Sequence, residues 1–190
     1  MATSWLLEGN YKRVLEGFEE YLSLIPEDTE ARLYAGWARL QLGEDERAEG
    51  NKAEADKKAS DAEQEFRRVL HDNPDEAAAH YALAMALRPL NRSQDDIQHE
   101  LREAIRLNPQ FALAHDALGK SFHSQGRLDE AEQEYFEALR CDPTYPSPHR
   151  GLYELFQERG RSDRAYTELQ AWRVKTEQAE RRTLPSLNIT

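Results

Sequence analysis

Histidine is the residue type in this chain most suited to chemistry, because imidazole binds transition metals and moves protons near neutral pH. The six histidines do not cluster, and no two of them are three or four residues apart, the spacing that puts two metal ligands on one helix face. His80, His115 and His149 instead recur at nearly equal intervals of about 34 residues. That spacing indicates an internal repeat, and we expect neither a metal site nor a cofactor.

The single cysteine, Cys141, is the only thiol that could act as a nucleophile. It precedes Asp142 and Pro143 at the expected end of a helix, where the negative end of the helix dipole raises the pKa of a thiol. The sequence contains no glycine-rich phosphate loop, no G-x-S-x-G elbow and no H-E-x-x-H helix. We therefore expect no catalytic residue and no enzyme activity.

The composition limits the classes of partner. A net charge of −11 argues against nucleic acid, since binding to phosphates depends on clustered Lys and Arg. No segment approaches the roughly 20 apolar residues of a membrane span, and the first residues lack the apolar core of a signal peptide. One cysteine cannot form an internal disulfide. We expect a cytoplasmic protein that binds neither nucleic acid nor membranes.

Prolines and glycines reveal the elements that position these residues. Pro74, Pro109 and Pro143 follow one another at the same interval as the histidines, whereas the gap from Pro26 to Pro74 is longer. Two glycine pairs, Gly9 with Gly43 and Gly126 with Gly160, have this spacing too, and Asn91 occupies the equivalent turn position of the third unit. The chain is therefore a tandem repeat with a period of about 34 residues.

One unit, residues 112–143, reads as two amphipathic helices around the turn Gln125-Gly126-Arg127, closed by a proline. Small residues recur where helices must approach closely, and aromatic residues fill the space between them. This pattern resembles the tetratricopeptide-repeat family, whose motif positions are met by Gly119, Phe122, Ala131, Tyr135, Ala138 and Pro143.

The resemblance implies an all-α fold, a right-handed α-α superhelix of about four full repeats behind a truncated N-terminal one, in a single solenoid domain over residues 1–190. We divide the chain into a truncated first repeat (1–26), a second repeat (27–74), a third (75–109), a fourth (110–143), a fifth repeat or capping helix (144–182) and a tail (183–190).

The second repeat is longer than the others because a segment, residues 50–63, is inserted in it. The insert is rich in Ala, Glu, Lys and Asp and lacks large apolar residues, so we expect a solvated helical extension. At about 1.5 Å per residue it would add roughly 21 Å, which is nearly four helical turns and keeps the buried faces in phase.

In this family the first helix of each unit lines a concave surface, so the resemblance implies a binding groove there. Spare apolar residues on these helices change to charged ones along the chain, which suits an amphipathic helix or a peptide with an acidic end. The alternative is that Trp37 and Met85 pack against the truncated first unit or the insert. The candidate partner-binding residues are Leu33, Trp37, Leu40, Tyr81, Met85, Lys120, His123 and Arg150.

The two ends of the chain form a second candidate interface. Residues 159–190 carry seven Lys and Arg against four Asp and Glu, while residues 1–158 carry a net charge of −14. A basic end beside an aromatic residue suits a second copy of the chain or an acidic filament. The candidate residues of this end interface are Trp5, Leu6, Trp172, Arg173 and Lys175.

These observations favour a non-catalytic adaptor or scaffold that binds a peptide or helix of another protein. A structural, self-assembling or filament-associated protein of cytoskeletal or pilus type is the alternative. A second alternative is the substrate-docking domain of a larger enzyme, since a fold alone does not exclude a grafted site.

Overall fold

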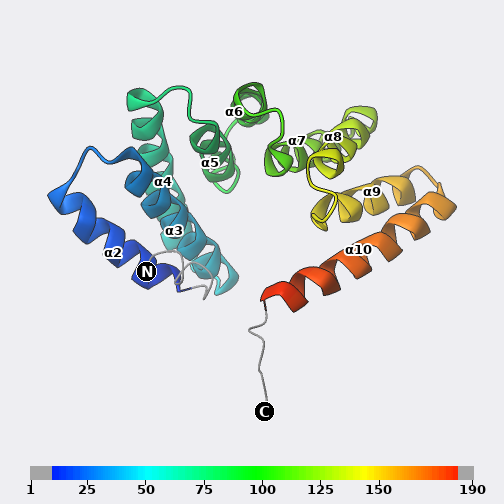
Figure 1. Cartoon of the computed structure of the whole chain (residues 1–190), viewed down its shortest axis with the longest axis horizontal. Helices are drawn as coiled ribbons and strands as arrows, with labels where there is room; N and C mark the ends of the chain where they lie inside the picture. Colours follow the sequence, from blue (N-terminus) through cyan, green and yellow to red (C-terminus); the bar gives the residue numbers. More distant parts are fainter. Residues whose placement is uncertain (1–9, 184–190) are drawn as a thin grey trace, which may run out of the picture. The chain divides into compact units, whose positions relative to one another are not determined.

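The computed structural model describes the backbone of residues 10–183 and the side chains of residues 10–179. Over this range the chain forms nine helices and no strand, as the sequence predicts (Figure 1). They are α2 (Tyr11–Leu24), α3 (Thr29–Ala48), α4 (Lys52–Asp72), α5 (Ala77–Leu87), α6 (Gln94–Leu107), α7 (Ala112–Ser124), α8 (Leu128–Cys141), α9 (Ser147–Glu158) and α10 (Ser162–Thr183).

The chain divides into two compact units, one ending at Asn108 and the other beginning at Pro109. In the first unit α2 packs on α3, α3 on α4, α4 on α5 and α5 on α6, and α3 also contacts α5. In the second unit α7 packs on α8, α8 on α9 and α9 on α10, and α7 also contacts α9. The first helices of successive pairs therefore meet within each unit: α3 contacts α5 in one unit, and α7 contacts α9 in the other. A shared binding face requires this arrangement.

Local sequence fixes where helices begin and turn. The Asp28 carboxylate accepts a hydrogen bond from the Ala31 amide at 2.9 Å, and the Ser93 hydroxyl accepts one from the Asp95 amide at 3.2 Å, so both act as helix N-caps. Asn91 has a φ of 52°, the left-handed conformation that the period predicts for this turn. A short polar side chain tolerates that conformation better than a bulky one.

The turn of the second repeat lies seven residues later than the glycine period predicts. Gly50, with a φ of 89°, makes the turn, whereas Gly43 is buried inside α3. A Cβ on Gly43 would lie 3.2 Å from the Ala55 carbonyl oxygen, so this glycine lets α3 and α4 approach closely. The insert thus lengthens both helices of the pair, to 20 and 21 residues, where α5 to α9 have 11 to 14.

The prediction that the insert is a solvated extension is wrong for one of its faces. Ala55, Ala59 and Ala62 are at most 2% exposed, in the helix that packs on α3. The prediction considered only large apolar residues. Alanine also packs in a helix contact, because its small side chain allows two helices to approach closely. Ion pairs from Arg47 to Asp56 (2.8 Å) and from Lys58 to Glu46 (3.3 Å) join the two lengthened helices across this contact.

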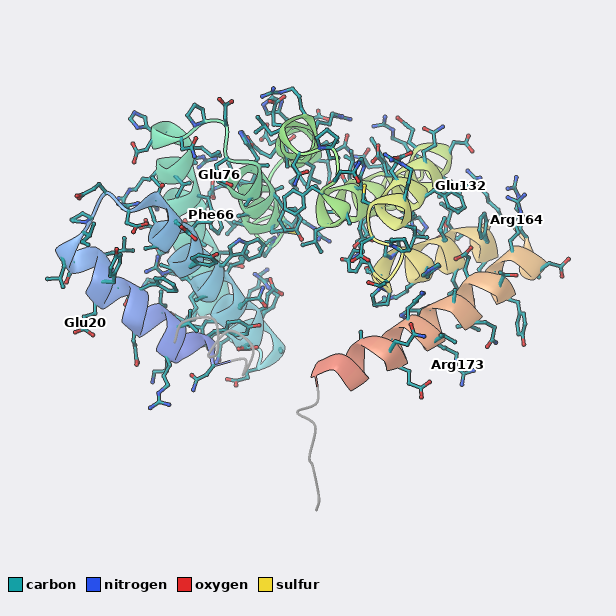
Figure 2. The ribbon with its side chains drawn as sticks, viewed as in Figure 1. Glu20, Phe66, Glu76, Glu132, Arg164 and Arg173 are labelled. Carbon is teal, nitrogen blue, oxygen red and sulfur yellow. The ribbon has the colours of Figure 1, made fainter. Side chains whose placement is uncertain are left out.

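One aromatic ring packed against glycine organises each unit. In the second unit the buried Tyr135 ring of α8 lies between Gly119 of α7 and Gly151 of α9. A Cβ on Gly119 would lie 2.8 Å from the ring, and one on Gly151 would lie closer still. In the first unit a Cβ on Gly36 of α3 would lie 2.5 Å from the ring of Phe66 in α4, a residue labelled in Figure 2.

Replacing Gly151 with Ala should destabilise the fold by about 1 to 3 kcal/mol, because the added methyl group overpacks the Tyr135 ring. Urea unfolding followed by circular dichroism measures this change. The matched control is Gly17→Ala on the exposed side of α2, where alanine's better helix propensity should stabilise by up to about 1 kcal/mol. A Gly151→Ala protein as stable as wild type would contradict the packing described here.

Deleting residues 50–63 should leave a folded protein with a standard second repeat. The deletion places Ala48 at the position that Ala62 occupies now, and it makes Gly43 available for the turn. Circular dichroism should show a cooperative melt and a smaller helical signal per chain. Loss of cooperative unfolding would instead show that the alanine contact between the lengthened helices is essential for folding.

Candidate functional site

The three repeated histidines each hold a pair of helices together. His115 Nδ1 lies 2.7 Å from Glu134 Oε2 on α8, and its Nε2 lies 3.3 Å from the Pro109 carbonyl oxygen in the preceding turn. His80 repeats the arrangement, 2.7 Å from Glu100 Oε2 and 3.0 Å from the Pro74 carbonyl oxygen. These contacts, which we call clamps, join a first helix to its partner helix and to the proline turn before it.

The contact with the partner helix recurs in all four helix pairs with one change of residue type, and the contact with a proline carbonyl is made by His80, His115 and Arg32. His149 Nδ1 lies 2.7 Å from Glu168 Oε2 on α10. In the longer second repeat, Arg32 Nη1 donates to Glu65 Oε2 at 2.9 Å, and Arg32 also donates to the Pro26 carbonyl. The sequence contained a signal for these pairs: each glutamate follows its histidine by 19 or 20 residues.

The predicted apolar binding residues lie in the first unit. The Trp37 ring of α3 lies with its centroid 5.6 Å from that of Tyr81 on α5 and 6.0 Å from that of Phe66 on α4. Trp37 and Tyr81 are both half-buried, so each keeps part of its surface exposed. Phe66 lies outside the insert, and the aromatic contacts of Trp37 thus bridge regular parts of three helices.

The other apolar candidates differ in how much surface they offer. Leu33 and Met85 are half-buried, and Arg88 Nη1 lies 3.8 Å from Met85 Sδ. Leu40 is only 3% exposed and belongs to the core, so its prediction as a contact residue is corrected. Tyr34, which the sequence reasoning did not select, is 38% exposed and stacks on Phe18 of α2 with ring centroids 5.6 Å apart.

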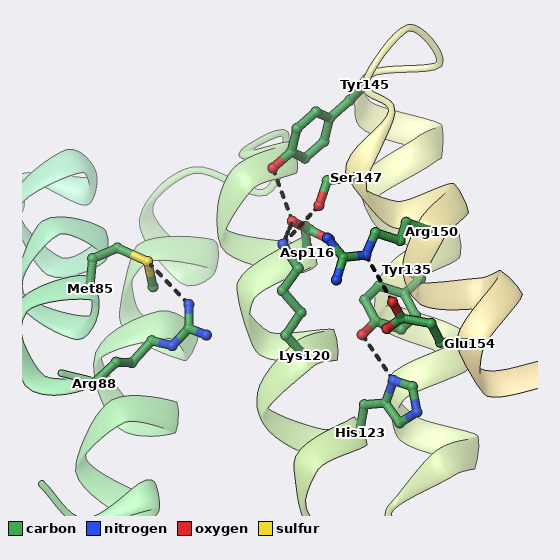
Figure 3. A network of polar contacts seen from close by, with 10 residues as sticks. All are labelled: Met85, Arg88, Asp116, Lys120, His123, Tyr135, Tyr145, Ser147, Arg150 and Glu154. Carbon is green, nitrogen blue, oxygen red and sulfur yellow. Dashed lines mark hydrogen bonds and ion pairs between the residues drawn. The ribbon is translucent and has the colours of Figure 1, made fainter. Parts of the chain in front are cut away.

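Polar residues of α7 and α9 form a network in the second unit (Figure 3). Asp116 is 2% exposed, and its Oδ2 accepts hydrogen bonds from Lys120 Nζ at 2.7 Å and from the Tyr145 hydroxyl at 2.9 Å. Lys120 Nζ also donates to Ser147 Oγ at 2.7 Å, at the start of α9. This network links the two first helices of the unit.

The remaining predicted cation and the predicted histidine of this unit also have acidic partners. Arg150 donates to Glu154 at 2.8 Å, and that hydrogen bond raises the pKa of the guanidinium. His123 Nε2 lies 3.1 Å from Glu158 Oε1, and its Nδ1 lies 3.4 Å from the Tyr135 hydroxyl. Burial, together with Asp116 and other acidic neighbours, raises the pKa of Tyr135, which therefore stays neutral. The charged side chains on this face are already paired with one another. These contacts therefore do not favour a binding site for the acidic end of a peptide.

Of the predicted end residues, Trp5 and Leu6 lie outside the described residues. Trp172 is half-buried, with the Arg150 guanidinium 6.0 Å from its ring centroid. Arg173 is exposed on α10, where Figure 2 labels it, and Lys175 is half-buried. With 22 residues α10 is longer than its partner α9, which has 12, and its C-terminal part extends past that helix (Figure 1).

The described residues contain no group of three or more His, Cys, Asp or Glu side chains placed to hold a metal ion. Burial raises the pKa of the Cys141 thiol, the direction that its position at a helix end predicts. Between residues 10 and 183, none of the helices combines the length and apolar character that crossing a bilayer requires.

Comparisons with known proteins identify the repeat. The tetratricopeptide-repeat model matches residues 50–102 and 98–146, while no curated protein sequence matches the chain. Solved structures with the same fold include TTC0263, a tetratricopeptide-repeat protein of Thermus thermophilus. It has a TM-score of 0.73 and 22% identity over 90% of this chain and 86% of that one.

A crystal structure of MamA has a TM-score of 0.65 and 18% identity over 95% of this chain and 97% of that one. MamA of Desulfovibrio magneticus RS-1, from residue 41 to its end, has a TM-score of 0.64 and 19% identity over 94% and 91% of the two chains. At these identities the likeness concerns the fold, and it confirms the predicted all-α repeat class. Because the matched residues span more than half of the sequence, the chain belongs to the tetratricopeptide-repeat family.

Proposed function

We propose that this protein is a non-catalytic adaptor or scaffold that binds a peptide or helix of another protein on the first helices of its repeats. Tetratricopeptide repeats generally act as protein-binding modules, and the contacts of this chain support that role. The single cysteine, which cannot form an internal disulfide, fits a protein of the cytoplasm.

The observation that carries the proposal is the half-buried pair of Trp37 and Tyr81, which spans α3 and α5. A fully structural tryptophan would be enclosed, whereas this one is held by Phe66 and Tyr81 and keeps exposed surface. Rigid, partly exposed aromatic residues are the side chains that most often dominate binding energy at interfaces. Exposed Tyr34, three residues before Trp37 on α3, enlarges the apolar surface offered by that helix.

The polar face of the second unit suits a role in specificity. Lys120 and Arg150 already have carboxylate partners, so a ligand gains little from a single opposite charge there. A partner would need donors and acceptors that match the existing pairs, since unmatched ones would be left desolvated. In this proposal the apolar face of the first unit anchors a partner, and the paired face of the second unit, taken by itself, admits only ligands that match its existing pairs.

Trp37→Ala should weaken binding of a partner by about 2 kcal/mol or more, roughly thirtyfold in Kd, because the mutation removes the exposed aromatic anchor. The partner is first isolated by crosslinking in native lysate, and its purified form is then titrated by calorimetry. Leu24→Ala is the matched control, since Leu24 is 78% exposed at the end of α2, away from the Trp37 contacts. It should leave the Kd unchanged.

Because Trp37 also contacts Phe66, its loss could lower stability. Tyr34→Ala is therefore measured in parallel: its ring is more exposed, and the change should weaken the same partner severalfold with little effect on the melt. If both variants bind as wild type does, the aromatic face of α3 is not the binding surface and the proposal fails.

Self-association is the second candidate function, favoured by the length of α10. The C-terminal half of α10 carries exposed Arg173 and Val174, the latter 48% exposed, next to half-buried Trp172. A helix end with exposed basic and apolar residues suits an acidic surface, and residues 1–158 of a second copy carry a net charge of −14.

Under this candidate, sedimentation velocity at low salt should show a species heavier than the monomer, and salt should dissociate it as the charges are screened. Arg173→Glu with Lys175→Glu should abolish that species. Arg127→Glu with Arg140→Glu makes the same charge change elsewhere in the second unit and should not. A monomer at every salt and protein concentration tested would exclude self-association through α10.

A further inference from the structure

The hydrogen-bond partners of His115 and His80 permit one protonation state. Both ring nitrogens of each residue face acceptors, a carboxylate oxygen at Nδ1 and a proline carbonyl oxygen at Nε2. A neutral imidazole has one N–H donor, and only the imidazolium has two. Both hydrogen bonds exist together only when the ring carries a positive charge.

Arg32 provides an independent reason to expect a cation at this position. It occupies the same place in the second repeat, and its guanidinium donates to the same two kinds of acceptor, the Glu65 carboxylate and the Pro26 carbonyl. Arginine is always protonated in proteins, so the geometry of the clamp is satisfied there by a permanent charge. The histidines fill the same role with a charge that depends on pH.

The groups around the His115 ring favour its charged form, and acidic residues also lie near the other two rings. Glu134 and Glu137 of α8 face His115, and the Cys141 thiol lies 3.6 Å from the same Pro109 carbonyl. Glu100 and Glu103 of α6 lie near His80, and Glu168 of α10 pairs with His149. The three histidine side chains are between 9% and 14% exposed, so these interactions are only weakly screened.

We propose that His115 is a proton-binding clamp, which locks its helix pair when protonated and releases the proline turn when it loses a proton to solvent, and that His80, with the same two kinds of acceptor, is built for the same role. The neutral ring keeps its Nδ1–H bond to the carboxylate. Its Nε2 lone pair then faces the carbonyl oxygen of the proline, and the contact with the turn becomes repulsive. The described part of the chain thus contains a pH-sensitive element that goes beyond its proposed role in binding.

The direction of the pH effect follows from the hydrogen bond to Glu134, which raises the pKa of His115 above its ordinary value. The unfolded chain has a histidine pKa near 6.5, so the stabilisation is fully present below about pH 6.5. It is lost as the pH rises through the higher pKa of the folded state. Each pH unit between the two pKa values lowers the folding equilibrium constant about tenfold.

Carbon-13 NMR of the labelled histidines in the folded chain tests the proposal directly. The reference is the ordinary histidine pKa of about 6.5. The His115 ring should titrate at a higher pH than this value, and Glu134→Gln should lower its midpoint. A His115 midpoint at or below about pH 6.5 would overturn the proposal, whatever the stability data show.

Urea unfolding at about pH 6 and about pH 9 tests the consequence for stability. His115→Arg copies the residue found at position 32 and should lose less stability between the two pH values than wild type does. His115→Gln, which cannot be charged, should be destabilised mainly at the lower pH. Equal pH dependence in wild type and His115→Arg would also overturn the proposal. Should either variant fail to fold, the titration of His115 in the wild type and in Glu134→Gln decides.

Discussion

The close approach of glycine-bearing first helices to a buried aromatic ring, one ring in each unit, is the constraint on which the rest of the structure depends. Tyr135 fits because Gly119 and Gly151 present no side chain, and Phe66 fits because Gly36 presents none. With the helices at this distance, the histidine and arginine side chains reach across to the glutamates of the partner helix. The packing therefore sets both the clamps and the faces that remain for binding.

The same constraint explains how the second repeat accepts the inserted residues 50–63. Each helix of the pair gains about two turns, which returns its small residues to the same side, so Ala55, Ala59 and Ala62 continue the close contact with α3. The turn moves to Gly50, and Gly43 changes from a turn residue into a packing residue. The spacing between Arg32 and Glu65 grows by the length of the insert while their contact is preserved.

The sequence predicted the repeat, its period and the helix class, because these depend on residue types that recur at fixed intervals. The left-handed turn at Asn91 could be predicted for the same reason. The site was predicted less well, since periodicity predicts which face of a helix a residue lies on but not how exposed its side chain is. Leu40 proved buried while Tyr34 proved exposed, a difference set by how neighbouring helices cover α3. The clamps were missed because each histidine was considered alone, without the glutamate 19 or 20 residues later.

The central claim is that the first helices of the repeats form the protein-binding surface. Amide hydrogen exchange of the chain with and without its isolated partner tests this most directly, because it reports protection along every helix at once. Protection on binding should concentrate in α3 and α5 of the first unit, with any further protection in α7 and α9. Protection confined to the partner helices α4, α6 and α8 would contradict it.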